Sequence, residues 1–202
     1  MFGIDKASFY SSRYFLDLKT LAEARGVERD KYTIGLSQGK MAVCPPGEDV
    51  VTLAANAAKT ILDPDDIQDI DTVLFATESG VDQSKSAGIY LHHLLKLPRQ
   101  CRVIELKQAC YAATAGLQIA MSLLKAHPER KILLIASDVA RYGLNTSGES
   151  SQGCGSVALL LSKKPRMLSI EEGAGYAVED NMDFWRPNYR DEALVDGRFS
   201  CQ

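Results

Sequence analysis

Two residue types that carry out nucleophilic and acid–base chemistry, a cysteine and a glutamate, each follow an apolar run. Cys110 comes after "RVIELK" and directly precedes an alanine-rich stretch that the sequence predicts to be a helix. A thiolate is the nucleophilic form of cysteine, and a helix N-terminus can lower a thiol pKa from its usual value of about 8.5. Glu78 follows the run "DTVLFAT". Cys110 is therefore a candidate nucleophile with a lowered thiol pKa, unless it is simply a small residue without chemistry.

A thiol paired with a carboxylate suits acyl transfer followed by carbon–carbon bond formation. An acyl thioester needs a sulfur atom to carry it and a base to remove its α-proton. A cysteine protease would instead place a histidine beside the sulfur, and none of the three histidines follows a predicted strand. His92 and His93 lie within a predicted amphipathic helix, where surface or partly buried positions fit better than metal ligation. We therefore expect acyl chemistry rather than proteolysis.

The composition limits the class of protein and its partners. The chain has 202 residues, of which 46% are hydrophobic and 24% are charged, with a formal net charge of −3. This composition fits a globular α/β protein and gives no basic surface for nucleic acid or an anionic membrane. The five cysteines are scattered, so neither a disulfide framework nor a metal site is expected. No apolar run reaches membrane-spanning length, and we expect a cytoplasmic protein.

Strand and helix patterns alternate along the chain. Near-continuous apolar runs predict strands, and apolar residues at helical spacing predict the helices between them. The predicted strands are "FGIDKASFY", "DTVLFAT", "RVIELK", "KILLIAS" and "SVALLLS". The predicted helices include "LDLKTLAEARG", with Asp17 at its start and Gly26 as its stop, "EDVVTLAANAAKTIL", ended by an Asp-Pro turn, and "SAGIYLHHLLKL". The predicted fold class is α/β, with a mainly parallel mixed sheet covered by helices on both faces.

Polar side chains follow the predicted strands. Glu78, Cys110 and Asp138 each lie at a strand end, and Tyr142 and Asn145 come soon after Asp138. Ligands of parallel sheets gather at the carboxyl ends of the strands, so we expect these side chains to converge. The segment "NTSGESSQGCGS" lacks the lysine of a phosphate-binding P-loop and is interpreted as a ligand-lining loop or a turn. No linker marks a boundary, so residues 1–202 are predicted to form one domain.

Five motifs, in this order, resemble those of the bacterial hydroxymethylglutaryl-CoA synthases. They are "ATESGVD", "ELKQACYAAT", "ASDVARYGLN", "GCGSVALLL" and "DFWRP" with the later "LVDGRFS". They span nearly the whole chain, and five ordered motifs are more specific than any one of them. The resemblance implies a thiolase-like half-fold, the nucleophile-bearing N-terminal portion of a family that is built from two similar α/β halves and pairs as dimers.

The resemblance also implies a reaction. Cys110 would take the acetyl group from acetyl-CoA as a thioester, and Glu78 would be the general base that turns the acetyl methyl into an enolate-like carbon. This carbon would attack the ketone of acetoacetyl-CoA, and hydrolysis would free hydroxymethylglutaryl-CoA, within the mevalonate pathway of isoprenoid synthesis. The CoA thioesters are substrates, so no cofactor is expected. A backbone N–H at the helix start beside Cys110 would contribute to an oxyanion hole.

Further site residues follow from positions that match the family. Tyr142, Asn145, Ser151 and Ser200 match positions lining the acyl-CoA substrate. Asp138 and Asp183 match acidic residues that support the active site. A structural alternative stays open for both, because Asp138 could end a strand or cap the next segment and Asp183 could cap the turn at "DFWRP". Trp185 beside a proline is interpreted as a packing anchor rather than a channel residue.

One family feature has no match in this sequence. The family uses a histidine to orient or protonate the acetoacetyl carbonyl, and it lies beyond the stretch matched here, in the C-terminal half. Half-folds expose apolar surface, so we expect this chain to need a partner, either that half or another copy in a homodimer. Two rivals remain: a β-branching synthase homologue acting on carrier-protein-tethered acyl chains, and a non-catalytic assembly subunit.

Overall fold

The computed structural model describes residues 1–196 of the chain, and these residues form two compact units. The first unit contains residues 1–11, 46–138 and 155–172. The second unit contains residues 12–45, 139–154 and those from 173 onward. Within the described residues, no helix combines the length and the apolar character that crossing a membrane would require.

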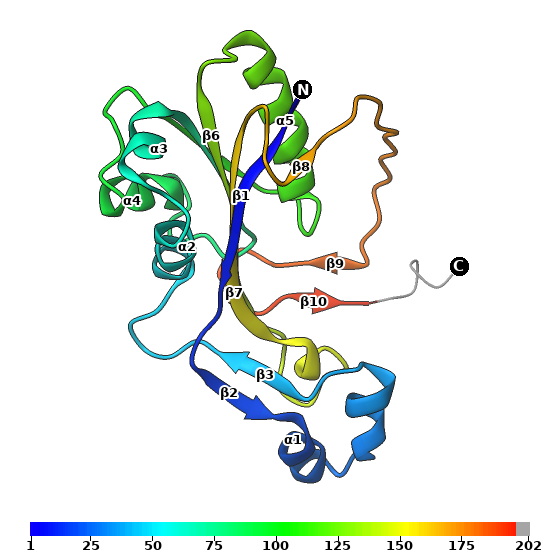
Figure 1. Ribbon diagram of the computed structural model, residues 1–202. Helices are drawn as coiled ribbons and strands as arrows, with labels where there is room; N and C mark the ends of the chain where they lie inside the picture. Colours follow the sequence, from blue (N-terminus) through cyan, green and yellow to red (C-terminus); the bar gives the residue numbers. More distant parts are fainter. Residues whose placement is uncertain (197–202) are drawn as a thin grey trace. The chain divides into compact units, whose positions relative to one another are not determined.

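The first unit is built on a six-stranded sheet (Figure 1). Its strand order is β5 (Arg102–Leu106), β4 (Ile70–Ala76), β6 (Lys131–Ala140), β7 (Gly153–Lys163), β1 (Phe2–Tyr10) and β8 (Leu168–Ser169). The last two residues of β6 and the first two of β7 belong to the second unit. Each of the five longer strands overlaps one of the apolar runs from which a strand is predicted, with β4 and β5 ending one residue before their runs, so these strand predictions are confirmed.

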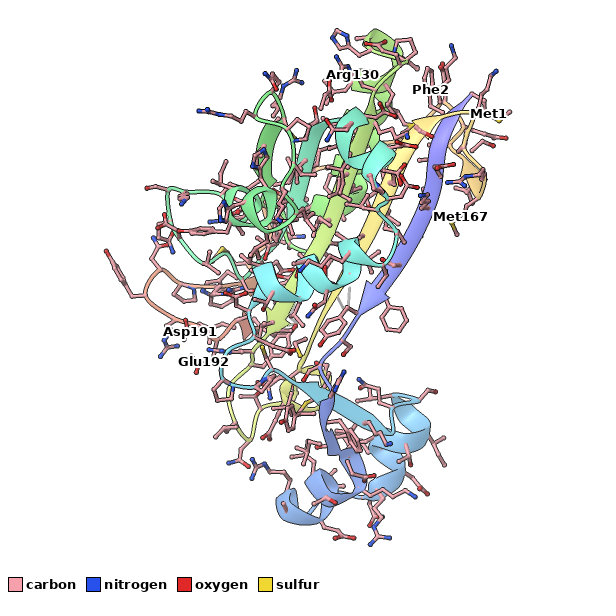
Figure 2. All side chains as sticks on the ribbon, turned by 60° about the vertical axis from the view of Figure 1, so that its left-hand side comes forward. Met1, Phe2, Arg130, Met167, Asp191 and Glu192 are labelled. Carbon is pink, nitrogen blue, oxygen red and sulfur yellow. The ribbon has the colours of Figure 1, made fainter. Side chains whose placement is uncertain are left out.

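The sheet is mixed, as the sequence predicts. β4 pairs in parallel with both β5 and β6, and Leu74 lies opposite Ile104 on one side and Leu134 on the other. β1 pairs antiparallel with β7 and β8. Figure 2 shows Met167, which precedes β8, beside the strand that begins at Phe2. The parallel part of the sheet is therefore the part that carries Glu78, Cys110 and Asp138 at one edge.

Helices cover both faces of this sheet. α5 (Ala112–Ala126) lies on one side, and α2 (Val50–Lys59), α3 (Pro64–Asp69) and α4 (Ala87–Leu94) lie on the other (Figure 1). An apolar core between α5 and the sheet includes the buried side chains Leu74, Leu124 and Leu134. Gly116 of α5 packs so closely that a Cβ atom there would lie 2.7 Å from a methyl group of Leu134. The helical spacing of apolar residues thus seats α5 directly on the strands that position the site.

Helix α3 was not predicted from the sequence. The Asp-Pro signal was interpreted only as the end of the preceding helix, and α2 does end at Lys59. The same signal also starts a new helix, because Asp63 accepts a hydrogen bond from the Asp66 backbone N–H and Pro64 occupies the first turn. Asp66 is buried at 3% exposure, and Lys131 and Lys6 both donate to its carboxylate. These ion pairs explain how a charged side chain is accommodated there.

The second unit contains shorter elements. β2 (Tyr14–Asp17) pairs antiparallel with β3 (Lys40–Val43), and α1 (Leu18–Arg25) follows β2. Asp17 caps α1 by accepting from Lys19, and Gly26 ends it with a φ of 62°, as the sequence predicts. The remaining elements are η1 (Lys31–Gly35), η2 (Glu149–Ser151), β9 (Phe184–Trp185) and β10 (Leu194–Val195). Arg25 of α1 forms a two-contact ion pair with the buried Glu149, which ties α1 to η2.

Candidate functional site

Three parallel strands bring an acid, a thiol and a second acid to one edge of the sheet in the first unit. Glu78 lies two residues after β4, and Cys110 lies four residues after β5. Asp138 lies near the end of β6. Because β4 lies between β5 and β6 with parallel register, the carboxyl ends of these strands are neighbours. The predicted convergence of these three residues is confirmed.

The thiol of Cys110 points at the carboxylate of Glu78. Its Sγ atom lies 3.7 Å from Glu78 Oε1, and the thiol donates a hydrogen bond to this oxygen. Cys110 is exposed, while Glu78 is half-buried. The preceding residue, Ala109, has a φ of 43°, a left-handed conformation that residues with a Cβ atom rarely adopt. Cys110 therefore lies on a strained turn between β5 and α5, with its thiol in contact with a carboxylate.

The pKa of the Cys110 thiol is raised, contrary to the prediction of a lowered value. Partial burial raises it most, and the negative charge of Glu78 and the hydrogen bond to Glu78 raise it further. The charge of Asp138 acts in the same direction, and only the residue's own backbone N–H opposes these effects. α5 begins at Ala112, two residues later, so its N-terminus does not outweigh two carboxylates. The two carboxylates thus oppose the thiolate form of Cys110.

Asp138 contacts the backbone that carries Glu78. Its Oδ1 atom accepts from the Glu78 backbone N–H at 2.7 Å and from the Ser79 backbone N–H at 3.1 Å. The hydroxyl groups of Thr77 and Ser79 donate to the same atom at 3.0 Å and 2.8 Å. Asp138 therefore links β6 to the residue that faces the thiol. Its carboxylate bonds this backbone and does not cap the segment that follows β6.

Tyr142 lies in the second unit, where several contacts hold it. Its backbone N–H donates to Gln152 Oε1 at 2.8 Å. Its ring meets that of Phe184 edge to face, with centroids 6.4 Å apart. A Cβ atom at Gly148 would lie 2.9 Å from the Tyr142 ring, so only glycine fits beside the ring at that position. The segment interpreted as a ligand-lining loop or a turn is therefore packed around this tyrosine.

A pocket of about 500 Å³ opens beside Tyr142 within the second unit. Its lining consists of Tyr142, Gly143, Thr146, Ser147, Gly148, Trp185, Arg190, Glu192, Ala193, Leu194, Val195 and Asp196. Tyr142 and Trp185 form its aromatic surface. Trp185, which was interpreted as a packing anchor, thus lines a pocket. Its position next to "RP" in the sequence carried no signal of this, because the pocket wall is completed by residues around Tyr142.

The other predicted substrate-binding residues lie apart from the thiol in the chain. Asn145 is exposed with a φ of 59°, and its backbone N–H donates to Glu149. Ser151 is exposed, and its hydroxyl donates to the Gly148 carbonyl. Asp183 precedes β9, and its backbone carbonyl accepts from Asp196. All of these residues belong to the second unit, as does Tyr142. Ser200 lies outside the described residues.

Sequence reasoning missed the residues that support these groups. Thr77 and Ser79 stand on either side of Glu78, and hydroxyl residues flanking a strand-end acid were the available signal. Gln152 and Glu149 hold the Tyr142 and Asn145 backbones, and no pattern in the sequence pointed to them. Within residues 1–196, no group of three or more histidine, cysteine, aspartate or glutamate side chains is arranged to hold a metal ion.

Comparisons with known proteins identify the family of this chain. The family described as hydroxymethylglutaryl-coenzyme A synthase N terminal matches residues 2–165. A hydroxymethylglutaryl-CoA synthase from Enterococcus faecalis is 46% identical over 98% of this chain and 52% of its own length. The polyketide 3-hydroxy-3-methylglutaryl-ACP synthase PksG of Bacillus subtilis is 36% identical over 92% of this chain and 48% of its own. The chain spans about half the length of the curated relatives it matches.

Solved structures of HMG synthases are also similar to this chain. A crystal structure of an HMG-CoA synthase complexed with CoA superposes with a TM-score of 0.96 at 47% identity, covering 98% of this chain and 51% of that one. The HMG synthase of the curacin pathway, in complex with acetyl donor-ACP, gives a TM-score of 0.89 at 40% identity, with coverages of 98% and 50%. The α/β fold of this chain is thus the fold found in these synthases.

Proposed function

We propose, from the premise that this chain belongs to the hydroxymethylglutaryl-CoA synthase family, that it provides the nucleophile and the base of such a synthase. The reaction joins acetyl-CoA, acetoacetyl-CoA and water into hydroxymethylglutaryl-CoA and CoA. One observation carries this proposal: the Cys110 thiol donates to the Glu78 carboxylate across 3.7 Å. A sulfur that can hold an acetyl group thus lies beside a base that can reach that group.

The first step is acetyl transfer. Glu78 takes the thiol proton along the existing hydrogen bond, and the Cys110 thiolate attacks the carbonyl carbon of acetyl-CoA. The bond to the CoA sulfur breaks, and the departing CoA thiolate recovers the proton from Glu78. Since the pKa of the thiol is raised, this proton transfer to an adjacent base replaces the resting thiolate expected from the sequence.

The second step uses the same carboxylate on a different proton. Once Cys110 carries the acetyl group, the thiol proton is gone and Glu78 faces the acetyl methyl. Removal of a methyl proton gives an enolate carbon, which bonds to the ketone carbon of acetoacetyl-CoA, and the ketone oxygen gains a proton. Water then cleaves the thioester and frees the product. The histidine that the family uses at the ketone has no match in this sequence, so we assign that role to the remainder of the enzyme.

Substrate contacts are proposed for the second unit. Tyr142 and the pocket of about 500 Å³ beside it suit the apolar and amide portions of an acyl-CoA chain. Asn145, Ser151 and Ser200 are proposed to contact the same chain, and Asp183 to support the site, because they match the family's positions. The chemistry relies on a thiol and a carboxylate, so we propose that no resident cofactor is needed.

The assembly is proposed to be larger than this chain. Its relatives are about twice as long, so we propose that a C-terminal half completes the site and that the enzyme acts as a homodimer. We further propose that it works in the cytoplasm, within the mevalonate pathway. The 46% identity to the Enterococcus hydroxymethylglutaryl-CoA synthase, against 36% to PksG, supports a CoA-dependent enzyme over a polyketide enzyme.

A second candidate function uses carrier-protein substrates. It is favoured by the 36% identity to PksG and by the 40% identity to the curacin synthase, which was solved with acetyl donor-ACP. The two candidates share Cys110 and Glu78 and differ only in the acetyl donor. Acetylation of the protein by acetyl-CoA at rates far above those with an acetylated carrier protein would favour the CoA enzyme, and the reverse would favour the polyketide enzyme.

Intact-mass spectrometry after incubation with acetyl-CoA tests the proposal. We expect one acetyl adduct, mapped to Cys110 and lost in Cys110→Ser. Cys101→Ser is a matched control, because burial and the charge of Asp71 raise the pKa of the Cys101 thiol to about 11 and leave it unreactive. Glu78→Ala should still form the adduct, because loss of the neighbouring charge lowers the pKa of the Cys110 thiol and lets it ionise without this base, but it should lose condensation by at least about 100-fold. An adduct that persists in Cys110→Ser would show that another residue is the nucleophile.

A further inference from the structure

We propose that the hydroxyl groups of Thr77 and Ser79 are positioning groups that hold Glu78 against Cys110 through the carboxylate of Asp138. This inference rests on the proposed function of Glu78 as the base. Thr77 and Ser79 flank Glu78 in the sequence. They act on the base through Asp138 and not on the substrate.

One carboxylate oxygen of Asp138 accepts hydrogen bonds from three successive residues, Thr77, Glu78 and Ser79. Its Oδ1 atom accepts from Thr77 Oγ1 at 3.0 Å and from Ser79 Oγ at 2.8 Å. It also accepts from the backbone N–H groups of Glu78 and Ser79. Thr77 Oγ1 in turn accepts from the Ser79 N–H at 3.0 Å. The backbone on both sides of Glu78 is thereby tied to a single point.

That point is held by the sheet. Asp138 lies in β6 directly after Ser137, which is buried and donates its hydroxyl to the Val50 carbonyl at 2.7 Å. Thr77 is 3% exposed, and its backbone N–H donates to the Leu106 carbonyl of β5 at 3.2 Å. The direction in which the Glu78 side chain leaves the backbone is therefore set by β5 and β6 together.

The loop has a second anchor beyond Ser79. Glu105 of β5 accepts from the backbone N–H of Ala87, the first residue of α4, at 2.7 Å. The loop also passes close to this carboxylate at Gly80, where a Cβ atom would lie 3.0 Å from Glu105 Oε1. Removal of the two hydroxyl groups leaves this anchor intact. The substitutions then alter only the orientation of the Glu78 side chain, while the loop and α4 keep their positions.

The orientation of Glu78 matters because its carboxylate accepts a proton from two different groups in succession. It meets the thiol proton first and the acetyl methyl second, and a displacement of about 1 Å can slow such chemistry about 100-fold. We expect the double variant T77V/S79A to condense about 10- to 100-fold more slowly, with covalent acetylation changed less than about threefold, because a thiol further from Glu78 has a lower pKa and ionises more readily without it. A general loss of folding would lower both reactions together.

The pH profile of Cys110 alkylation by iodoacetamide tests the positioning without any substrate. Glu78→Ala serves as the reference, because it removes the charge and the hydrogen bond that raise the thiol pKa. T77V/S79A should shift the profile toward that of Glu78→Ala, with alkylation at pH 7.5 at least about threefold faster than in the unchanged protein. T77S and S79T, which keep the hydroxyl groups, should restore the original profile.

The matched control is T72V. Thr72 is buried within β4, and Thr77 is buried directly after this strand. The hydroxyl of Thr72 donates to Asp71 and not to Asp138. An unchanged profile in T72V and a shifted one in T77V/S79A support the positioning role. An unshifted T77V/S79A profile, or an unshifted Glu78→Ala profile, overturns it, as does an equal loss of acetylation and condensation. If the unchanged full-length protein takes up no acetyl group, the proposed function fails, while the alkylation profiles still decide the role of the hydroxyl groups.

Discussion

Gly148→Ala should disturb the substrate pocket by displacing the Tyr142 ring. The added Cβ atom would lie 2.9 Å, 3.0 Å and 3.2 Å from three carbon atoms of the Tyr142 side chain, where ordinary contacts exceed 3.4 Å. The ring cannot simply swing away. Its backbone N–H donates to Gln152, and its ring makes an edge-to-face contact with the ring of Phe184. A shift of several tenths of an ångström must therefore be absorbed by the packing of this segment.

Two opposing effects set the size of the change. Gly148 has a φ of −81°, which alanine also adopts, so the substitution gains about 0.4–1 kcal/mol by restricting the unfolded chain. Overpacking against a constrained side chain costs about 1–3 kcal/mol. We therefore expect a net loss of about 1–2 kcal/mol in the free energy of unfolding. If Tyr142 contacts the acyl-CoA chain, KM for acetyl-CoA should rise about tenfold, since about 1.4 kcal/mol corresponds to a factor of ten.

Urea unfolding and steady-state kinetics of the full-length enzyme check both numbers, with Gly153→Ala as the control. Gly153 lies five residues further along, and a Cβ atom there meets nothing within 4 Å. Gly153→Ala should be as stable as the unchanged protein or slightly more stable, with an unchanged KM. The reasoning is refuted if Gly148→Ala is no less stable than Gly153→Ala. A lower stability with an unchanged KM would instead remove Tyr142 from substrate binding.

Three further outcomes are expected. Glu78→Gln should lower the pKa of the Cys110 thiol, because it removes a negative charge beside it, so the rise of covalent acetylation with pH should move to lower pH. The hydrogen bond from Arg25 lowers the pKa of Glu149, so this ion pair stabilises the fold above the ordinary glutamate pKa and loses its effect as the pH falls through the lowered, folded-state pKa. The urea midpoint of the unchanged protein should therefore fall between about pH 5 and pH 3. The urea midpoint of Glu149→Gln should depend less on pH in this range. Ala109→Val should lower the free energy of unfolding by about 1–2 kcal/mol, because a β-branched residue resists a φ of 43°, whereas Ala109→Gly should change it by less than about 1 kcal/mol in chemical denaturation.

Local patterns were sufficient for the five longer strands and for helices α1, α2, α4 and α5. The apolar runs around Leu74 and Leu134 predicted two neighbouring strands, and both form parallel partners in one sheet. Asp17 and Gly26 marked the ends of α1 correctly, because a cap depends on atoms within one helical turn. Helix α3 was not predicted, since one Asp-Pro pair ends one helix and begins another, and neither were the short elements β2, β3, β8, β9, β10, η1 and η2.

The meeting of Glu78, Cys110 and Asp138 was also accessible from the sequence. Each follows or ends a predicted strand, and parallel strands present their carboxyl ends at one edge. The motifs around these residues resemble those of one enzyme family, which the comparisons confirm. Residue order along the chain was enough to foresee that these three side chains come together.

What the sequence by itself determined is thus the longer strands and helices, the family and the three strand-end residues. Tertiary structure alone decided the state of the thiol, because the Cys110 pKa depends on burial and on carboxylates 28 and 32 positions away in the chain. It likewise decided that Thr77 and Ser79 hold Asp138 and that Trp185 lines a pocket. Periodicity and caps act over a few residues, whereas charge interactions, cavities and hydrogen-bond networks depend on distances in space that residue order does not specify.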